Sequence, residues 1–460
     1  MPCGVLGEPG EKEDRVVVAE RRARAIWAIA VLVYVFAVFH RTSLGVAGLD
    51  AAERFTIGPA ALGIFTVLQI GVYALMQVPT GLLVDRYGPR RVLTVAAVLM
   101  GLGQLIFAFA GSYPLALVAR AVLGVGDAMA FVSVLRLIAA HYPARRYTLF
   151  AAITATLGAV GNLAATVPLT LLLHHAGWTV TFAVTGAATA AYAIVVALRV
   201  RDVPHGEPSQ RSEAGTLGET LDQVRQVWRV AGTRLGFWVH FSTMFAPAVL
   251  GLLWGYPYLV QAQGLAPAAA GTVLSAMVVV AGVSGPIVGQ TIGRRPEWRL
   301  PMVAGYLAVA VGLWGLLLGW PGGRVPVVVI AIAFSLMAVG GPLSGIAFAL
   351  ARDYNPIRRV GTATGVVNVG GFAAITITAL AIGLLLGGDA TKADTSAFRV
   401  AFLAVVAVLL IGSWRTAVWW RRARAEVFAA VERGEPVPVQ IRRRAWDLHE
   451  LRERAGSQRT

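Results

Sequence analysis

Several charged residues lie inside long apolar runs of the sequence, where an ionised side chain is costly, and three of them could bind an ionic ligand. The run at about 26–48 contains Arg41, and the run at about 114–139 contains Arg120 and Asp127. Guanidinium groups form bidentate hydrogen bonds with carboxylates, and a carboxylate can accept and release a proton. The residue types therefore predict binding of an organic anion, with a proton as a second ligand.

The spacing of these residues places them deep in their helices. Arg120 and Asp127 are seven residues apart, close to two full turns, so both lie on one face of a helix. At 1.5 Å per residue, Arg41 and Asp127 lie roughly 22 Å and 18 Å from the inner ends of their helices. A charge at bilayer depth costs about 2.5–3.5 kcal/mol even on the lenient insertion scale. We therefore expect the three side chains to border a water-filled cavity or to contact one another.

Two interpretations of these residues stay open. In the first, Arg41 and Arg120 bind the anionic group of a substrate, and Asp127 carries a coupled proton. In the second, they form a static salt bridge that ties two helices together, and substrate binding depends on other groups. His40 either shares a proton with Asp127 or is a packing residue.

Only a membrane accounts for the composition around these residues. The chain is 57% hydrophobic and 14% charged, whereas a typical soluble domain has about 25% charged residues. A spanning helix needs about 20 apolar residues, so the 460 residues have room for a dozen spans. The net charge of +16 lies at the chain ends, in a central segment and in short loops. That distribution suits membrane orientation, and we expect no nucleic-acid partner.

The apolar runs predict an all-α integral membrane protein with twelve transmembrane helices. They cover residues about 26–48, 59–84, 90–111, 114–139, 147–173, 177–198, 235–261, 267–291, 299–320, 325–351, 360–386 and 396–420. The plan has an N-terminal tail (1–24), a six-helix bundle (25–198), a linker (199–234), a second six-helix bundle (235–420) and a C-terminal tail (421–460). Apolar residues at helical spacing in 216–230 predict an interfacial helix, or a short soluble helix packed on the bundle.

Arginines mark one side of the predicted array. The loops after the second, fourth, eighth and tenth spans, both termini and the linker are rich in arginine. Such loops remain cytoplasmic, so we expect a multi-pass protein of the plasma (cytoplasmic) membrane with both termini cytoplasmic. Lys12 and Lys392 are the only lysines, and this arginine bias indicates a bacterial source with a GC-rich genome.

The sequence contains an internal repeat at a constant offset. Pro59 and Pro267 are 208 residues apart, and the same offset separates Gly81 from Gly289 and Arg86 from Arg294. A register without gaps across a helix and its exit loop predicts two pseudo-symmetric six-helix bundles. Duplicated halves with a central substrate site are a known transporter plan.

Three segments resemble the major facilitator superfamily of transporters. They are the loop Gly81-Leu82-Leu83-Val84-Asp85-Arg86-Tyr87-Gly88-Pro89-Arg90-Arg91, the helix-four segment Arg120-Ala121-Val122-Leu123-Gly124-Val125-Gly126, and Gly361-Thr362-Ala363-Thr364-Gly365. The resemblance covers nearly the whole chain and implies alternating access by two bundles. In the second half the signature loop has decayed, because Gly293 stands where Asp85 does in the first half.

The resemblance implies that the signature loop is a conformational latch, formed by Gly81, Asp85, Arg86, Gly88, Arg90 and Arg91. Asp85 can cap the N-terminus of a neighbouring helix, where the helix dipole favours an anion. The three arginines serve either the latch or only the cytoplasmic orientation of the loop. Arg136, near the cytoplasmic end of the fourth span, is expected to pair with this loop or to reach the interface rather than contact substrate.

Within the superfamily the first half is most similar to the organic-anion:cation symporters. Their acidic residue and arginine in helix one correspond to His40 and Arg41, so the carboxylate is missing here. The substrate-binding candidates are Arg41, Arg120, Tyr73, Tyr256 and Asn368, and the proton-coupling candidates are Asp127 and His40. A polar residue in a spanning helix often only bonds a neighbouring helix, and that alternative applies to Tyr73, Tyr256 and Asn368.

We therefore expect a secondary active transporter that imports a small, anionic organic solute together with protons. The proton gradient is its energy source, so no cofactor is expected, and Cys3 as the only cysteine excludes a Cys-based metal site. We expect no metal at all, no enzymatic activity, a monomer, and no partner besides the substrate and the lipid bilayer.

Three other classes of function were weighed. A proton-driven exporter of drugs or metabolites keeps the same fold, but the glycine-proline signature of many exporters is absent after Gly161-Asn162. An ATP-driven pump needs a Gly-Lys phosphate loop, and neither lysine lies in one. A receptor or lipid scrambler that moves no solute is the remaining alternative.

Overall fold

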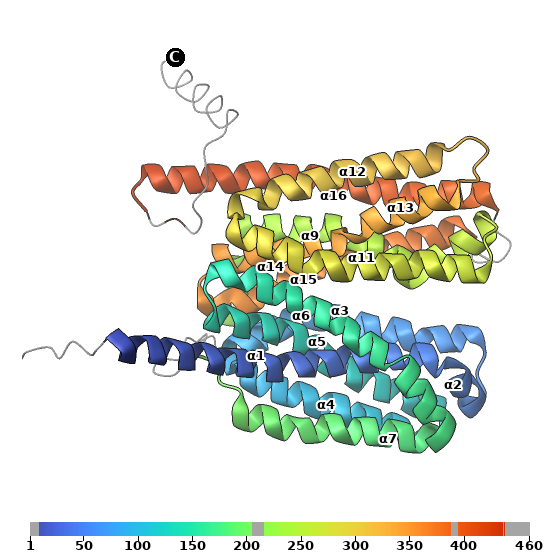
Figure 1. Cartoon of the computed structure of the whole chain (residues 1–460), viewed down its shortest axis with the longest axis horizontal. Helices are drawn as coiled ribbons and strands as arrows, with labels where there is room; N and C mark the ends of the chain where they lie inside the picture. The colour runs from blue at the N-terminus through green and yellow to red at the C-terminus, as the bar shows by residue number, and fades with distance from the viewer. Residues whose placement is uncertain (1–8, 205–215, 388–393, 436, 438–460) are drawn as a thin grey trace, which may run out of the picture. The chain divides into compact units, whose positions relative to one another are not determined.

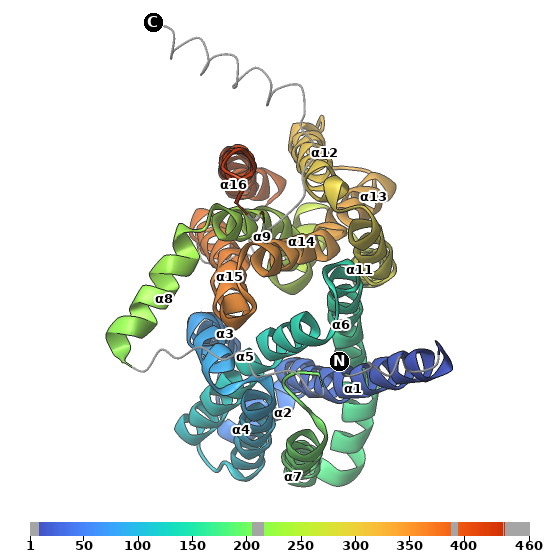
Figure 2. The ribbon, with the colours of Figure 1, turned by 90° about the vertical axis from the view of Figure 1, so that its left-hand side faces the viewer.

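The structure, a computed structural model, describes residues 9–204, 216–387, 394–435 and 437. Helices make up almost all of these ranges, and they contain no β-strand (Figures 1 and 2). The chain divides into two compact units. Unit 1 consists of Met1–Thr220 and Ile357–Gly365, and unit 2 of Leu221–Pro356 and Val366–Thr460.

Unit 1 contains seven helices in chain order among its described residues. They are α1 (Pro9–Val46), α2 (Gly48–Phe55), α3 (Pro59–Tyr87), α4 (Pro89–Phe109), α5 (Tyr113–His141), α6 (Ala144–Ala164) and α7 (Val167–Arg199). The amphipathic helix expected in the linker is present as α8 (Leu217–Arg229), which begins with a capping box. In this box the Thr216 N–H donates to Glu219 Oε2 (2.8 Å), and the Glu219 N–H donates to Thr216 Oγ1 (3.2 Å).

Unit 2 repeats the plan with more interruptions. Its helices are α9 (Ala231–Val249), α10 (Gly255–Pro257), α11 (Pro267–Arg294), α12 (Arg299–Gly319), α13 (Val327–Ala338), α14 (Gly340–Tyr354), α15 (Val360–Leu385) and α16 (Thr395–Glu432). Short 3₁₀ turns precede α12 and α15, at Pro296–Trp298 and Ile357–Arg359. The first residues of α15, up to Gly365, belong to unit 1.

The prediction of many membrane spans is confirmed. Within the described ranges, 11 helical segments are long and apolar enough to cross a membrane. The remaining expected span, 235–261, is α9 followed by π-helical turns at Leu250–Trp254 and Tyr258–Ala262 around α10. Pro247 and Pro257 lie in this segment, and proline removes an intrahelical donor, which loosens the regular α-helical pattern. The fold is therefore the expected array of twelve spanning segments in two bundles.

Several helix boundaries differ from those expected. The predicted fifth span (147–173) is interrupted, because α6 ends at Ala164 and Pro168 lies at the start of α7. The helix α7 then kinks at Gly177 (φ 72°), a conformation that glycine adopts without steric cost. The helices α1 and α16 extend into the predicted tails, to Pro9 and Glu432.

The internal repeat is visible in the helix ends. Both α3 and α11 begin with a proline, Pro59 and Pro267, whose missing N–H has no helical partner at that position in any case. Arg86 and Arg294 lie in the last turns of the same two helices. The offset of 208 residues therefore relates equivalent helices of the two units.

Glycines allow the helices of unit 1 to pack closely. A Cβ added at Gly101 of α4 would lie 2.7 Å from the Gly186 carbonyl oxygen of α7, and one added at Gly186 would lie 2.9 Å from the Gly101 oxygen. The same closeness occurs between Gly126 of α5 and the Ala96 oxygen of α4 (2.7 Å). Small residues at such contacts are the main means by which membrane helices approach each other.

This packing predicts that the same glycine-to-alanine substitution affects the thermal midpoint differently at two positions. Gly101→Ala should lower the thermal midpoint of the purified protein, because the new methyl group overpacks the α4–α7 contact at a cost of about 1–3 kcal/mol. Gly315→Ala on α12 is the matched control, since nothing lies within 4 Å of its Cβ position. Alanine there should be neutral or stabilising by up to about 1 kcal/mol. Equal midpoints for the two variants would contradict the close helix contact.

Candidate functional site

The helices α1 and α5 bring Arg41 and Asp127 into a bidentate ion pair inside unit 1. Arg41 Nε donates to Asp127 Oδ2 (2.8 Å), and Arg41 Nη2 donates to Asp127 Oδ1 (2.6 Å). This fork geometry is the strongest form of a charge-assisted hydrogen bond. The Arg41 guanidinium also lies over the ring of Tyr73 on α3, 4.6 Å from its centroid.

Arg120 lies beside this pair but contacts other groups. Its Nη2 donates to Gln69 Oε1, and its Nη1 donates to the His40 carbonyl oxygen (3.2 Å). Gln69 Nε2 lies 3.5 Å from Asp127 Oδ2, so the amide stands between Arg120 and Asp127. The four polar side chains therefore form one network across α1, α3 and α5.

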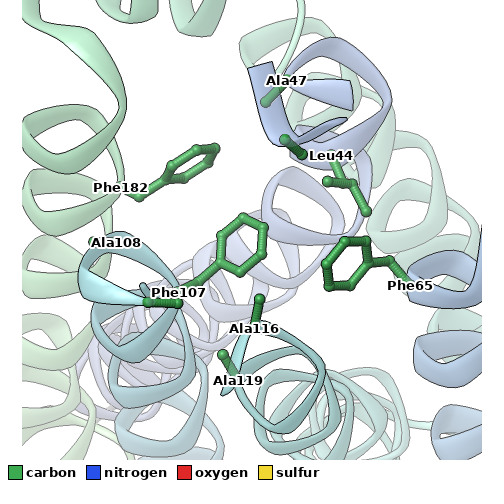
Figure 3. Close-up of a cluster of buried hydrophobic side chains, with 10 residues drawn as sticks. Leu44, Ala47, Phe65, Phe107, Ala108, Ala116, Ala119 and Phe182 are labelled. Carbon is green, nitrogen blue, oxygen red and sulfur yellow. The ribbon is translucent and has the colours of Figure 1, made fainter. Parts of the chain in front are cut away.

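The side chains of the network differ in their exposure to solvent. Arg120, Asp127 and Gln69 are buried, whereas 31% of the Arg41 side chain is exposed. The Arg120 guanidinium lies 5.5 Å from the Phe107 ring. Phe107 belongs to an apolar cluster with Phe65 and Phe182, shown in Figure 3. Arg41 is therefore the most exposed of the four side chains.

His40 is oriented toward α7 by a hydrogen bond. Its Nε2 lies 2.8 Å from Thr189 Oγ1, the residue is fully buried, and its carbonyl oxygen accepts from Arg120. These contacts agree with the packing interpretation of His40. Its role in proton coupling remains a prediction.

Two residues that contact the predicted site residues, Gln69 and Thr189, were not predicted from the sequence. Gln69 precedes Tyr73 and Gln77 by four and eight residues, so the three share one face of α3. That regular spacing of polar residues in an apolar helix is a signal that could have identified Gln69. No comparable pattern surrounds Thr189.

The candidates in unit 2 lie in different environments. Asn368 on α15 is buried, and its Oδ1 lies 3.1 Å from His240 Nε2 on α9. Tyr256 on α10 is 46% exposed. Across the described ranges of both units, no three His, Cys, Asp or Glu side chains are close enough to hold a metal ion.

The signature loop confirms the capping role predicted for Asp85. Its Oδ1 accepts from the Gly361 N–H (2.8 Å), and its Oδ2 accepts from the Thr362 N–H (2.6 Å) and hydroxyl (2.7 Å). These groups form the N-terminus of α15, where an anion is favoured by the free N–H groups and the helix dipole. Arg136 Nε lies 3.5 Å from Asp85 Oδ1, so the expected pairing of Arg136 with this loop is also confirmed.

The other latch candidates surround this contact in different ways. A Cβ added at Gly81 would lie 2.5 Å from the Gly361 oxygen, so the two backbones touch there. Gly88 takes a positive φ of 85° at the turn between α3 and α4. The side chains of Arg86, Arg90 and Arg91 are exposed, and the Arg90 N–H donates to Asp202 Oδ1 (2.7 Å). These exposed positions leave both interpretations of the three arginines open.

Comparisons with known proteins agree with this architecture. Residues 30–340 match the model of the Major Facilitator Superfamily. The chain is 28% identical to a probable sulfoacetate transporter of Cupriavidus necator over 62% of this chain and 67% of that protein. It is 24% identical to a probable galactarate/D-glucarate transporter of Escherichia coli over 80% of this chain and 88% of that protein.

A solved structure of a proton:xylose symporter shares the fold, with a TM-score of 0.67 and 15% identity over 88% of this chain and 96% of that one. The names of the two sequence relatives denote carriers of organic acids, which fits the resemblance to the organic-anion branch. Because the family model covers well over half of the sequence, the chain is a transporter that belongs to the major facilitator superfamily.

Proposed function

We propose that this protein imports a small organic acid together with protons across the cytoplasmic membrane by alternating access. Both termini lie on the cytoplasmic side, and the transporter works as a monomer. The observation that carries the proposal is the bidentate pair between buried Asp127 and partly exposed Arg41. The acid carriers among its relatives support an anionic substrate.

The pair provides a simple means of coupling. Ionised Asp127 occupies two donors of the Arg41 fork, and a protonated carboxyl holds that fork much less strongly. A substrate carboxylate or sulfonate can then take the same donors. Binding the anion and the proton together keeps the charge of the site unchanged, whereas either one alone leaves a net charge in a poorly solvated place. Substrate and proton therefore favour each other's binding.

Arg120 and Tyr73 support the Arg41–Asp127 pair through contacts with its neighbours and with Arg41. Arg120 orients Gln69 against Asp127 and adds positive potential, and the Tyr73 ring stacks on the Arg41 guanidinium. Asn368 and Tyr256 remain proposed substrate contacts of unit 2, where Asn368 pairs with His240 and Tyr256 is exposed. His40 positions Arg120 through its carbonyl oxygen.

The Asp85 contact acts as the latch of one conformational state. Asp85 holds the first residues of α15, and the rest of that helix belongs to unit 2. Breaking three hydrogen bonds to one carboxylate is costly, so the contact stabilises the state in which it forms. Gly81 lets the backbones meet at this point.

The first prediction concerns ligand class. Glucarate and sulfoacetate should raise the thermal midpoint of the purified protein, and neutral xylose should not, because only anions bind the Arg41 fork. The shift should vanish in Arg41→Ala and persist in Arg225→Ala, an exposed arginine of α8 that pairs with nearby Asp222. If only hydrophobic cations stabilised the protein and were transported outward, the import proposal would be wrong and drug export would take its place.

The second prediction separates coupling from binding. Asp127→Asn should abolish pH-gradient-driven accumulation of the acid in proteoliposomes, because the amide takes up no proton. Exchange of labelled for unlabelled substrate at equal pH should continue. Asp222→Asn on the surface of α8 is the control. Undiminished gradient-driven accumulation in Asp127→Asn would assign proton coupling to another residue.

The third prediction tests the latch. Asp85→Asn should slow initial uptake by about tenfold or more, since the charge that holds the α15 N-terminus is lost. The ligand-induced thermal shift should stay as in the wild type, because Asp85 does not contact Arg41 or Asp127. Thr362→Val removes only one of the three donors and should have a smaller effect. If Asp85→Asn took up substrate at the wild-type rate, the latch proposal would be contradicted and Asp85 would only cap α15.

A further inference from the structure

A large cavity lies in unit 1 between residues 18–29 of α1 and the C-terminal end of α7. Its volume is about 1270 Å³. It is lined by the first part of α1, the connection between α5 and α6, and the residues that follow α7. The network around Arg41 contributes no residue to it, and the transport mechanism proposed above does not use it.

The lining of the cavity is strongly basic. Among the described residues, Arg22, Arg146, Arg199 and Arg201 line it and Glu20 is the single acidic one, so the formal charge of the described lining is 4 − 1 = +3. Glu20 is already shared between Arg146 (2.6 Å) and Arg24 (2.7 Å). Asp202, next to Arg201, bonds the Arg90 backbone. The remaining positive charge calls for an anionic occupant.

Most of the other lining residues are apolar, and His141 and Tyr142 line the cavity as well. Ile26, Ile29 and Leu198 line the cavity together with the arginines, and Leu198 is 73% exposed. Ile29 lies seven residues beyond Arg22 on α1, which is roughly 10 Å along the helix. One end of the occupant therefore meets guanidinium groups and the other meets aliphatic side chains.

We infer that this cavity binds the headgroup of an anionic phospholipid such as phosphatidylglycerol. The phosphate contacts Arg22, Arg199 and Arg201, and the first part of the acyl chains lies along Ile26, Ile29 and Leu198. Basic pockets between membrane helices at the cytoplasmic leaflet are suited to such headgroups, and the arginine pattern places this end of the bundle on that side. A water-soluble anion would use the arginines but gain nothing from the apolar wall.

A bound lipid would connect the start of α1 with the end of α7. Arg146 already connects α1 to α6 through Glu20. The headgroup would add charged contacts between α1 and the residues at the end of α7. The helix α1 also carries Arg41, and anionic lipid should therefore stabilise the bundle that holds the substrate site.

The test compares lipids on the full-length purified protein. Phosphatidylglycerol added to the detergent-solubilised protein should raise the thermal midpoint and appear as a bound adduct in native mass spectra, whereas phosphatidylcholine should do neither. The triple variant Arg22→Gln/Arg199→Gln/Arg201→Gln should bind phosphatidylglycerol roughly tenfold more weakly or worse, given the attraction that each arginine contributes. Its midpoint in phosphatidylcholine should equal that of the wild type, because all three side chains are exposed.

A matched control removes the same charge elsewhere. Arg225→Gln/Arg229→Gln/Arg421→Gln replaces three exposed arginines outside the cavity, and its lipid binding should equal that of the wild type. If both triple variants lost the same amount of phosphatidylglycerol binding, the binding would reflect general charge attraction, and the proposed lipid site would be wrong. Glycerol 3-phosphate or inorganic phosphate that shifts the midpoint as much as the lipid would also overturn it, in favour of a soluble anion.

Discussion

The structure depends on the requirement that every charge within the bilayer has a partner. Arg41 satisfies Asp127 with two hydrogen bonds, and Arg120 is held by an amide and a backbone oxygen. Removing one member of such a set leaves a buried charge alone, which is far more costly than the pair is favourable. The helices of unit 1 are therefore packed around their polar contacts as much as around their apolar ones.

Among the described residues of unit 1, the two buried carboxylates have partners of different kinds. Within this part of the chain Asp127 is bound only by side chains, and one of them, Arg41, is partly exposed. Asp85 is bound chiefly by backbone N–H groups at the start of α15. Side chains can rotate away and exchange partners, whereas backbone donors move only with their helix. Asp127 is thus suited to exchanging partners, whereas the hydrogen bonds of Asp85 depend on the position of α15.

Much of this could be predicted because it is local. The spans follow from apolar runs, and the equivalence of α3 and α11 follows from prolines and glycines at a constant offset. The capping role of Asp85 was also predicted, because a helix N-terminus favours an anion, but the identity of the capped helix, 276 residues further along the chain, was not predicted. The interruption between α6 and α7 was missed, since no charged residue marks the break and Thr166 is the only polar residue between Ala164 and Pro168.

The sequence by itself determined that the chain lies in lipid, where its charges occur, and which of them share a helix face, because composition and helical period are properties of neighbouring residues. The tertiary structure alone decided the partners. Arg41 and Asp127 are 86 residues apart, and Arg120 and Gln69 are 51 apart. Which of two nearby guanidinium groups reaches a carboxylate depends on the rotation and tilt of whole helices, and these are set by close backbone contacts such as that of Gly101 with Gly186.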